Sequence, residues 1–343
     1  MVALGRHHRR ASADLVAAGQ PCRGAASQPV GRRVMDGLAS APSPRVLAVS
    51  ASNSRFMPFL RGMIGSLGQV LDRGEAELAC FDLGLDPADR AWLAGHGAVI
   101  AAPRAHLGVQ AGKHGPALLS FLARPFLQEY FPGYDVYVWI DSDVWLQDPA
   151  VLGRYVAGAL ASGMAVTHER ERGYRFQGWL FGWTAKHMLL GYGPAAAAHL
   201  LRRPHVNAGF FAVRAGAPHW DAWARRYAAA LGRTGALVPH DQFALNHAIY
   251  GDVLGGPDVA MTALLDPGCN WICDRGVPMW NDEAGAFCKP YPPYEPIGAV
   301  HLAGPAKRTA YDIRRTGGGS FHTYILRGAA PDQPVLDTPL AGT

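Results

Sequence analysis

The sequence has no apolar run that approaches the roughly 20 residues needed by a membrane-spanning helix. Its amino-terminal region is basic, but no apolar segment follows it, so it does not read as a secretory signal. With 343 residues, of which 49% are hydrophobic, the chain can bury a full core as one large domain or two small ones. These features predict a soluble globular protein of the cytosol.

Cysteine is scarce as well. The five cysteines include no Cys-x-x-Cys pair, and only Cys269, Cys273 and Cys288 cluster in the sequence. Their spacing matches none of the usual zinc-ligand patterns. We therefore expect reduced thiols, and a metal site made of these three cysteines is the less favoured alternative.

Most of the chain has no excess of either charge. Residues 1–45 contain seven arginines and two aspartates, and 7 − 2 = +5 is the net charge of the whole protein. The balanced remainder predicts no nucleic-acid partner. We expect residues 1–44 to form a basic, disordered extension. The alternatives are a wrongly assigned start and a segment that contacts nucleic acid or anionic lipid, the latter placing the protein at the inner membrane face.

Strands and helices alternate in the first part of the chain. The expected elements are a strand at Val46–Val49, a helix from Phe56 to Leu67, strands at Leu78–Phe81 and Ala98–Ala101, and a helix at Asp86–Leu93 between these two. This order favours an α/β fold with a doubly wound, mixed but mostly parallel sheet flanked by helices. We expect one domain over residues 45–316 and a carboxyl-terminal tail over 317–343.

Further along, a helix is expected over Gly115–Tyr130, interrupted at Pro125. Another helix should run from Pro149 to about Leu160, followed by a strand near Met164–Thr167. Residues 168–182 are polar, aromatic and glycine-containing without a clear period. A loop of this composition is a candidate lid or acceptor surface.

The most informative stretch is the apolar run Val136–Ile140, which ends at Asp141-Ser142-Asp143. A continuous apolar run suits a strand that is covered on both faces. Ligands of open α/β sheets bind just beyond the carboxyl ends of strands, where these two carboxylates would lie. Paired carboxylates in a cleft favour a divalent cation such as Mg²⁺ or Mn²⁺. The alternative is a turn that merely closes the strand.

Three later stretches carry chemistry of the same kind. Asn207-Ala208-Gly209 enters an apolar strand with small residues, which permits close approach of a ligand or marks a bulge. Asp241 and Gln242 open a helix, where Asp241 could cap the helix or both side chains could face the cleft.

The last of these stretches is His301-x-x-Gly304-x-x-Lys307. It offers an imidazole as a third metal ligand and, beyond a glycine turn, a lysine for an anion; a lone surface histidine and lysine are the alternative.

In this order, the motifs resemble those of the family-eight glycosyltransferases, the group of glycogenin and the bacterial lipopolysaccharide galactosyltransferases. The resemblance covers residues 45–313, and the His301-Gly304-Lys307 motif is its most specific part. Arg124 stands at the spacing before Asp141 where the family has a substrate-contacting arginine. The resemblance implies a GT-A fold with Rossmann-like nucleotide-sugar binding.

The resemblance also implies the roles of individual residues. Asp141, Asp143 and His301 would hold Mn²⁺ or Mg²⁺, and Lys307 would neutralise the donor diphosphate. The sugar pocket would be lined by Arg124 and by the motif Asn207, Ala208 and Gly209. Gln242, with Asp241, would lie near the anomeric carbon, and Gly304 would shape the turn before Lys307. In the turn after the first strand, Ser50 and Asn53 would contact the nucleotide.

The activity so implied is transfer of a hexose from a nucleotide-diphosphate sugar, a UDP-sugar first of all, with retention of the anomeric configuration. The acceptor would be a glycan, a lipid-linked group or a protein, as in bacterial glycan biosynthesis. Two positions differ from the family. Asn53-Ser54-Arg55-Phe56 replaces the usual Asp-x-Asn-Tyr, and no aspartate occurs between Pro149 and Trp220, only Glu169 and Glu171. A metal-dependent nucleotidyltransferase and a non-catalytic nucleotide-sugar binding protein remain alternatives.

Overall fold

The structure is a computed structural model that describes residues 43–109, 115–235, 240–252 and 256–331. The extension expected over residues 1–44 lies outside the described residues except for its last two. In the described part of the chain, every helix is too short or too polar to cross a membrane.

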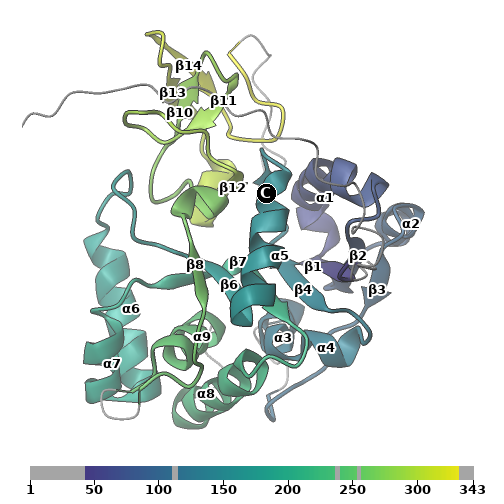
Figure 1. Cartoon of the computed structure of the whole chain (residues 1–343), viewed down its shortest axis with the longest axis vertical. Coiled ribbons are helices and arrows are strands. Elements are labelled where there is room, and N and C mark those ends of the chain that lie inside the picture. The colour runs from purple at the N-terminus through teal and green to yellow at the C-terminus, as the bar shows by residue number, and fades with distance from the viewer. Residues whose placement is uncertain (1–42, 110–114, 236–239, 253–255, 332–343) are drawn as a thin grey trace, which may run out of the picture. The chain divides into compact units, whose positions relative to one another are not determined.

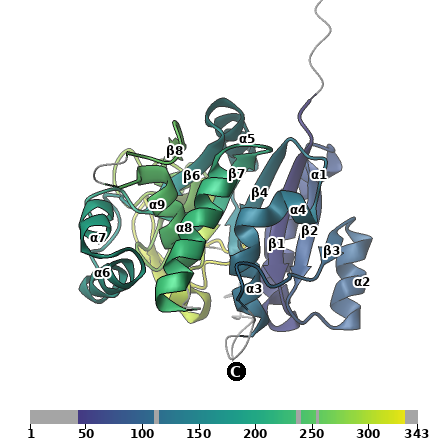
Figure 2. The same cartoon turned by 90° about the horizontal axis from the view of Figure 1, so that it is seen from below.

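A seven-stranded sheet organises the described residues, with the strand order β3-β2-β1-β4-β7-β6-β8 (Figures 1 and 2). Its strands are β1 (Val46–Ser52), β2 (Glu77–Asp82), β3 (Val99–Ala101), β4 (Val136–Ile140), β6 (Met164–His168), β7 (Val206–Arg214) and β8 (Ala263–Leu265). Strand β7 is antiparallel to both of its neighbours, and the other adjacent pairs are parallel. The predicted mixed, mostly parallel sheet is therefore confirmed.

Helices cover both faces of this sheet. They are α1 (Met57–Asp72), α2 (Pro87–Gly95), α3 (Pro116–Ala123), α4 (Leu127–Tyr130), α5 (Ala150–Ser162), α6 (Gly178–Tyr192), α7 (Pro194–Leu200), α8 (His219–Thr234) and α9 (His240–Tyr250). Helices α1 and α5 pack on one face, with Val138 of β4 in their core. Helices α3, α8 and α9 pack on the other face, with Trp139 of β4. Alternate residues of β4 thus serve two cores, which explains its continuous apolar run.

A second, small sheet lies against the first and has the order β5-β12-β9. It is formed by β5 (Val144–Leu146), β12 (Ala299–His301) and β9 (Trp271–Ile272). Two hairpins follow from β10 (Met279–Asn281), β11 (Ala286–Cys288), β13 (Tyr311–Arg314) and β14 (Ser320–Thr323). Ile325 is fully buried beyond β14, so the domain extends past residue 316, where we expected it to end.

Two sequence-based expectations need correction. The irregular segment expected up to Gly182 ends at Gln177, because helix α6 begins at Gly178. Asp241 lies within the first turn of α9 rather than before it, so it is not the cap of that helix. By contrast, the interruption expected at Pro125 is a short 3-10 turn, Arg124–Phe126, between α3 and α4.

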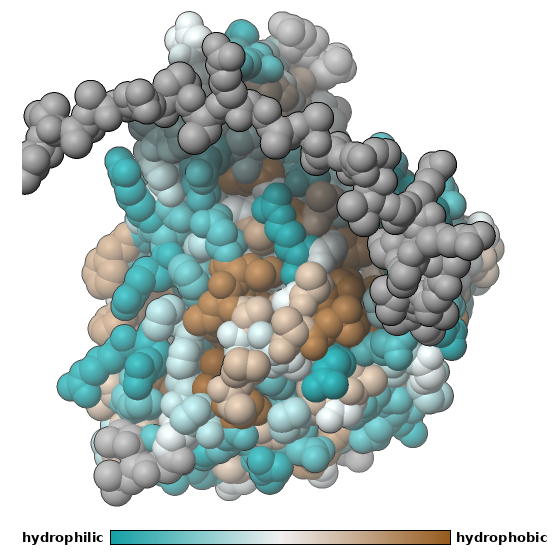
Figure 3. Space-filling model, viewed as in Figure 1, coloured by the Kyte–Doolittle hydropathy of each residue, from teal (hydrophilic) through white to brown (hydrophobic). Residues whose placement is uncertain are grey.

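The surface and the cysteines are less informative about function. On the face shown in Figure 3, hydrophobic residues gather over α5 and β8, the elements on which Leu160 and Leu264 are exposed. Cys269, Cys273 and Cys288 are buried free thiols. Among the described residues, they do not form a group able to hold a metal ion.

Candidate active site

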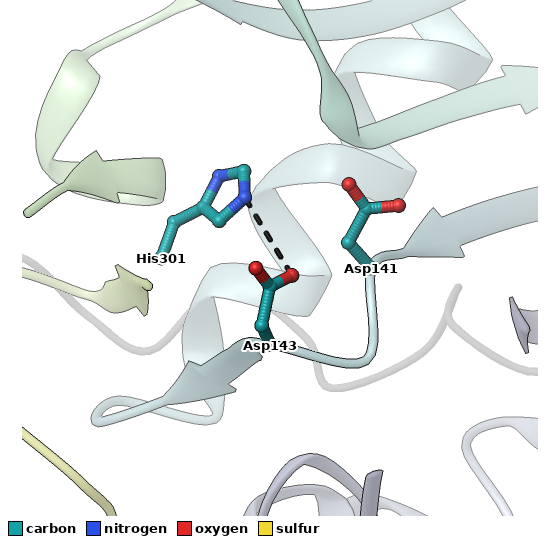
Figure 4. Close-up of side chains that lie close together, drawn as sticks. All are labelled: Asp141, Asp143 and His301. Atoms are coloured by element: carbon teal, nitrogen blue, oxygen red, sulfur yellow. Dashed lines mark ion pairs between the residues drawn. The ribbon is translucent and has the colours of Figure 1, made fainter. Parts of the chain in front are cut away.

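At the carboxyl end of β4, two carboxylates close together in sequence meet a histidine from a distant segment (Figure 4). Asp141 directly follows β4, Asp143 directly precedes β5, and His301 ends β12. Strands β5 and β12 pair so that His301 lies opposite Val144, and the Leu302 amide donates to the Asp143 carbonyl at 3.0 Å. One ligand atom from each of Asp141, Asp143 and His301 lies within 4.8 Å of the other two.

These atoms are spaced for a shared cation. His301 Nε2 lies 3.7 Å from Asp143 Oδ1, which is too long for a hydrogen bond. Both atoms could contact one ion, because ligand bonds to first-row divalent metals are roughly 2.0–2.2 Å long. The other ring nitrogen, Nδ1, is buried without a hydrogen-bond partner. Two carboxylates and one imidazole also form a donor set that can hold a divalent cation.

Gly209 keeps this space open. A Cβ at this position would lie 2.5 Å from His301 Cε1 and 2.9 Å from Asp141 Oδ2. The Gly209 carbonyl accepts the Asp141 amide at 2.8 Å, so the backbone of β7 runs directly beside the site. The glycine of the Asn-Ala-Gly motif therefore has a steric cause. The bulge alternative also fits, because the pairing of β6 with β7 shifts register opposite this motif, between Val166 and His168.

The two aspartates have different electrostatic surroundings. Burial raises the pKa of Asp141, and the charge of Asp143 adds to this effect, although Arg124 opposes it. Burial also disfavours the ionised form of Asp143, but Lys307 and His301 outweigh it and lower its pKa. Lys307 forms an ion pair with Asp143 Oδ2, on a turn in which Gly304 has a φ of +58°. The lysine thus lies at the site, and its contact with an anion stays a prediction.

Arg124 lies behind the site and joins two carboxylates. It is 4% exposed, and its Nη2 donates to Asp141 Oδ1 at 2.5 Å while its Nη1 donates to Asp241. Trp139 Nε1 donates to the same Asp141 oxygen at 2.7 Å. Asp141 Oδ1 therefore accepts two hydrogen bonds from protein side chains, which leaves Oδ2 as the oxygen for a cation. Asp241 is 2% exposed, so it holds Arg124 rather than facing the cleft, and the expectation that it acts near the anomeric carbon does not fit this geometry.

Asn207 and Gln242 meet on a carboxylate that sequence reasoning did not assign. Asn207 Nδ2 donates to Glu169 Oε1 at 2.8 Å, and Gln242 Nε2 donates to the same oxygen at 3.3 Å. Glu169 Oε2 accepts from Arg275 at 2.6 Å. Gln242 Oε1 accepts the Ala208 amide at 3.0 Å. In the sequence, Glu169 and Glu171 are the only acidic residues between Pro149 and Trp220, but nothing there indicated that Glu169 lies beside Asn207 and Gln242.

The turn after β1 borders the same site. Asn53 lines a pocket of about 220 Å³ together with Arg124, Asp141, Asp143 and Lys307. Its side chain also accepts the Phe56 amide at 3.1 Å. Ser50, in contrast, is fully buried within β1. It cannot contact a substrate in this structure, and the expectation that it binds the nucleotide is wrong.

Several solved structures share this fold. The galactosyltransferase LgtC in complex with donor and acceptor sugar analogs is 16% identical and has a TM-score of 0.48, over 77% of this chain and 89% of that one. The bifunctional WbbM is 13% identical with a TM-score of 0.47, over 79% and 47% of the two chains. Mouse xyloside xylosyltransferase 1 is 12% identical with a TM-score of 0.41, over 75% and 97%. All three are glycosyltransferases.

Neither a protein-family model nor a curated protein sequence matches this chain. At TM-scores below 0.5, the structural likenesses carry no weight for its activity, which has to follow from the site itself.

Proposed function

We propose that this protein is a metal-dependent glycosyltransferase that moves a hexose from a nucleotide-diphosphate sugar to a hydroxyl acceptor. The observation that supports this most strongly is the meeting of Asp141, Asp143 and His301. Both aspartates also line a pocket together with Lys307. Carboxylates with an imidazole bind a divalent cation, and a nearby lysine adds a second positive charge. Two cationic groups in one pocket match a diphosphate leaving group.

In this proposal, Asp141 Oδ2, Asp143 and His301 hold Mn²⁺ or Mg²⁺. When bound, the cation stabilises the negative charge that develops on the departing diphosphate. Lys307 stabilises the same negative charge. This stabilisation is larger in the transition state than in the ground state, because the charge develops as the bond breaks. Arg124 fixes the orientation of Asp141, since two of its nitrogens are held by Asp141 and Asp241.

The sugar would lie between this cationic group and the Asn207–Gln242 pair. Gln242 is held by Ala208, Glu169 and His205, which fixes its carboxamide beside the sugar. A retaining double displacement needs two carboxyl groups about 5 Å apart on either side of the bond. Glu169 is the carboxylate nearest to Gln242 here, but Asn207 and Arg275 occupy its oxygens. We therefore favour front-face attack, in which a leaving phosphate oxygen takes the acceptor's proton.

The experiment is to measure nucleoside diphosphate release from a panel of nucleotide sugars, UDP-sugars first, with Mn²⁺ or Mg²⁺ present and after chelation. Wild-type protein should release the diphosphate only with metal. Asp143→Ala should abolish release while the protein remains folded. Asp221→Ala, at an exposed aspartate in the first turn of α8, is the matched control and should keep full activity.

Two results would contradict the proposal. Undiminished release by Asp143→Ala would remove the metal site from the reaction. Release of pyrophosphate instead of a nucleoside diphosphate would indicate nucleotidyl transfer. Separately, detection by mass spectrometry of a sugar bound covalently to Gln242 or Glu169 would indicate a covalent mechanism instead of front-face attack. The proposed overall reaction would be unaffected.

A further inference from the structure

The outward face of helix α6 is apolar. Trp179, Trp183, Lys186 and Leu190 follow one another at spacings of four, three and four residues, and so lie on one face. Trp179 is 69% exposed and Leu190 is 46% exposed. A surface helix ordinarily turns its apolar face towards the core. In α6 the buried residues are only Met188 and Gly191.

More aromatic surface adjoins this face. Phe176 is 81% exposed just before the helix, and Phe181 is 50% exposed in its first turn. Their rings are 6.0 Å apart. Helices α6 and α7 lie side by side at the outer edge, away from β1 and β2, in both views (Figures 1 and 2). Exposed aromatic side chains gathered in this way mark an interaction site.

The exposed charged side chains of residues 168–203 all have the same sign. Residues 168–203 contain six basic and two acidic residues, a net charge of 6 − 2 = +4. The basic side chains are all exposed: Arg170, Arg172, Arg175, Lys186, Arg202 and Arg203. The two glutamates are both engaged, Glu169 with Arg275 and Glu171 with the Tyr291 hydroxyl. This segment therefore presents no exposed acidic side chain.

We propose that the outer face of α6, with Phe176 and the exposed basic residues of 168–203, docks on an anionic membrane surface. Tryptophan and phenylalanine side chains lie favourably at the boundary between headgroups and acyl chains. Arginine and lysine at the same level bind lipid phosphates and follow the negative surface potential. An outward apolar stripe inside a basic rim is the pattern of a helix that lies in the membrane interface.

This position has a consequence for the substrate, which rests on the proposed function. A pocket at α6 is lined by apolar residues that include Leu180, Met188 and Leu200, and by polar residues that include Glu169 and His205. Both of these polar residues contact Gln242. An acceptor carried by a lipid could thus reach the sugar site from the docked face of the protein.

The test is co-sedimentation of the full chain with vesicles, in the absence of nucleotide sugar. Vesicles of equal parts phosphatidylglycerol and phosphatidylcholine should bind the protein, and vesicles of phosphatidylcholine alone should bind at least about ten-fold less. A double variant, Trp179→Glu with Leu190→Glu, should lose binding about ten-fold or more. Lys186→Glu with Arg202→Glu should also weaken binding, and it leaves the apolar stripe unchanged.

Met261→Glu is the matched control, because Met261 is 61% exposed and lies outside residues 168–203. It should bind vesicles as the wild type does. Absence of wild-type binding, or equal losses in Met261→Glu and the Trp179 and Leu190 variant, would overturn the proposal. The proposal would also be overturned if light scattering showed that the wild type is a dimer and that the Trp179 and Leu190 variant is a monomer. In that case a second copy of the protein would cover this face. Nucleotide-sugar hydrolysis in solution should be unchanged in the same variant, which separates this proposal from the proposed function.

Discussion

Replacing Gly209 by alanine tests the site with the smallest possible change. The added Cβ would lie 2.5 Å from His301 Cε1, whereas ordinary contacts begin at 3.4 Å, so the ring or the strand must move by about 3.4 − 2.5 = 0.9 Å. It would also lie 2.9 Å from Asp141 Oδ2 and 2.9 Å from Asn207 Oδ1, so that movement is blocked on two further sides. Metal sites tolerate deviations of only about 0.2 Å in ligand distance. We therefore expect Mn²⁺ affinity to fall about 10- to 100-fold, and turnover at saturating metal to fall about 100-fold.

Calorimetric titration with Mn²⁺ and diphosphate release give the two readouts. Overpacking alone should cost roughly 1–3 kcal/mol of stability, so an overpacked variant away from the site is needed for comparison. Gly158→Ala provides it, because its Cβ would lie 2.8 Å from Ala165 Cβ and 3.0 Å from Ala263 Cβ, between α5 and the sheet. It should lose a similar free energy of unfolding and keep its metal affinity. Wild-type metal affinity in Gly209→Ala would refute the steric argument, and with it the placement of the cation.

Three further outcomes are expected. Lys307→Ala should fold normally and slow turnover about 100-fold, as for loss of one charge-stabilising donor, with Lys307→Arg partly restoring the rate; an unchanged kcat would place the lysine outside the reaction. Arg124→Met should lower the free energy of unfolding in urea by about 3–5 kcal/mol, because it removes the counter-charge of the buried Asp241 and of the partly buried Asp141, and a loss below about 1 kcal/mol would contradict this. Burial lowers the pKa of His219 to about 4. As pH falls from about 6.5 towards 4, His219 therefore binds a proton in the unfolded chain but not in the folded one. Over this range the free energy of unfolding should fall by up to about 3 kcal/mol more in the wild type than in His219→Gln.

The sequence was sufficient for elements whose apolar residues face a core. The helical spacing of Phe59, Leu60 and Met63 predicted α1, and the continuous apolar run predicted β4 with its two covered faces. Helix α6 was missed for a physical reason. Its apolar residues lie on both its inner and outer faces, so its sequence has no contrast of period 3.6.

Within the site, the sequence identified which residues take part better than it predicted where their side chains point. It placed Asp141, Asp143 and His301 together through a resemblance, but it could not show that Asp241 turns towards Arg124, because the two residues are paired only by the fold. Ser50 was expected in the turn after Val49, but β1 continues to Ser52 and is covered on both faces, so Ser50 is buried. Glu169 acquires its position from Asn207 and Arg275, which reach it from two other segments.

The pairing of β5 with β12 has a consequence for the making of this protein. Asp143 is synthesised 158 residues before His301, although the pairing of their strands brings the two side chains together. The central sheet can be complete while β12 is still missing. A chain released before β12 is made could thus form the central sheet but would lack His301. Under the proposed function, such a chain would not consume nucleotide sugars.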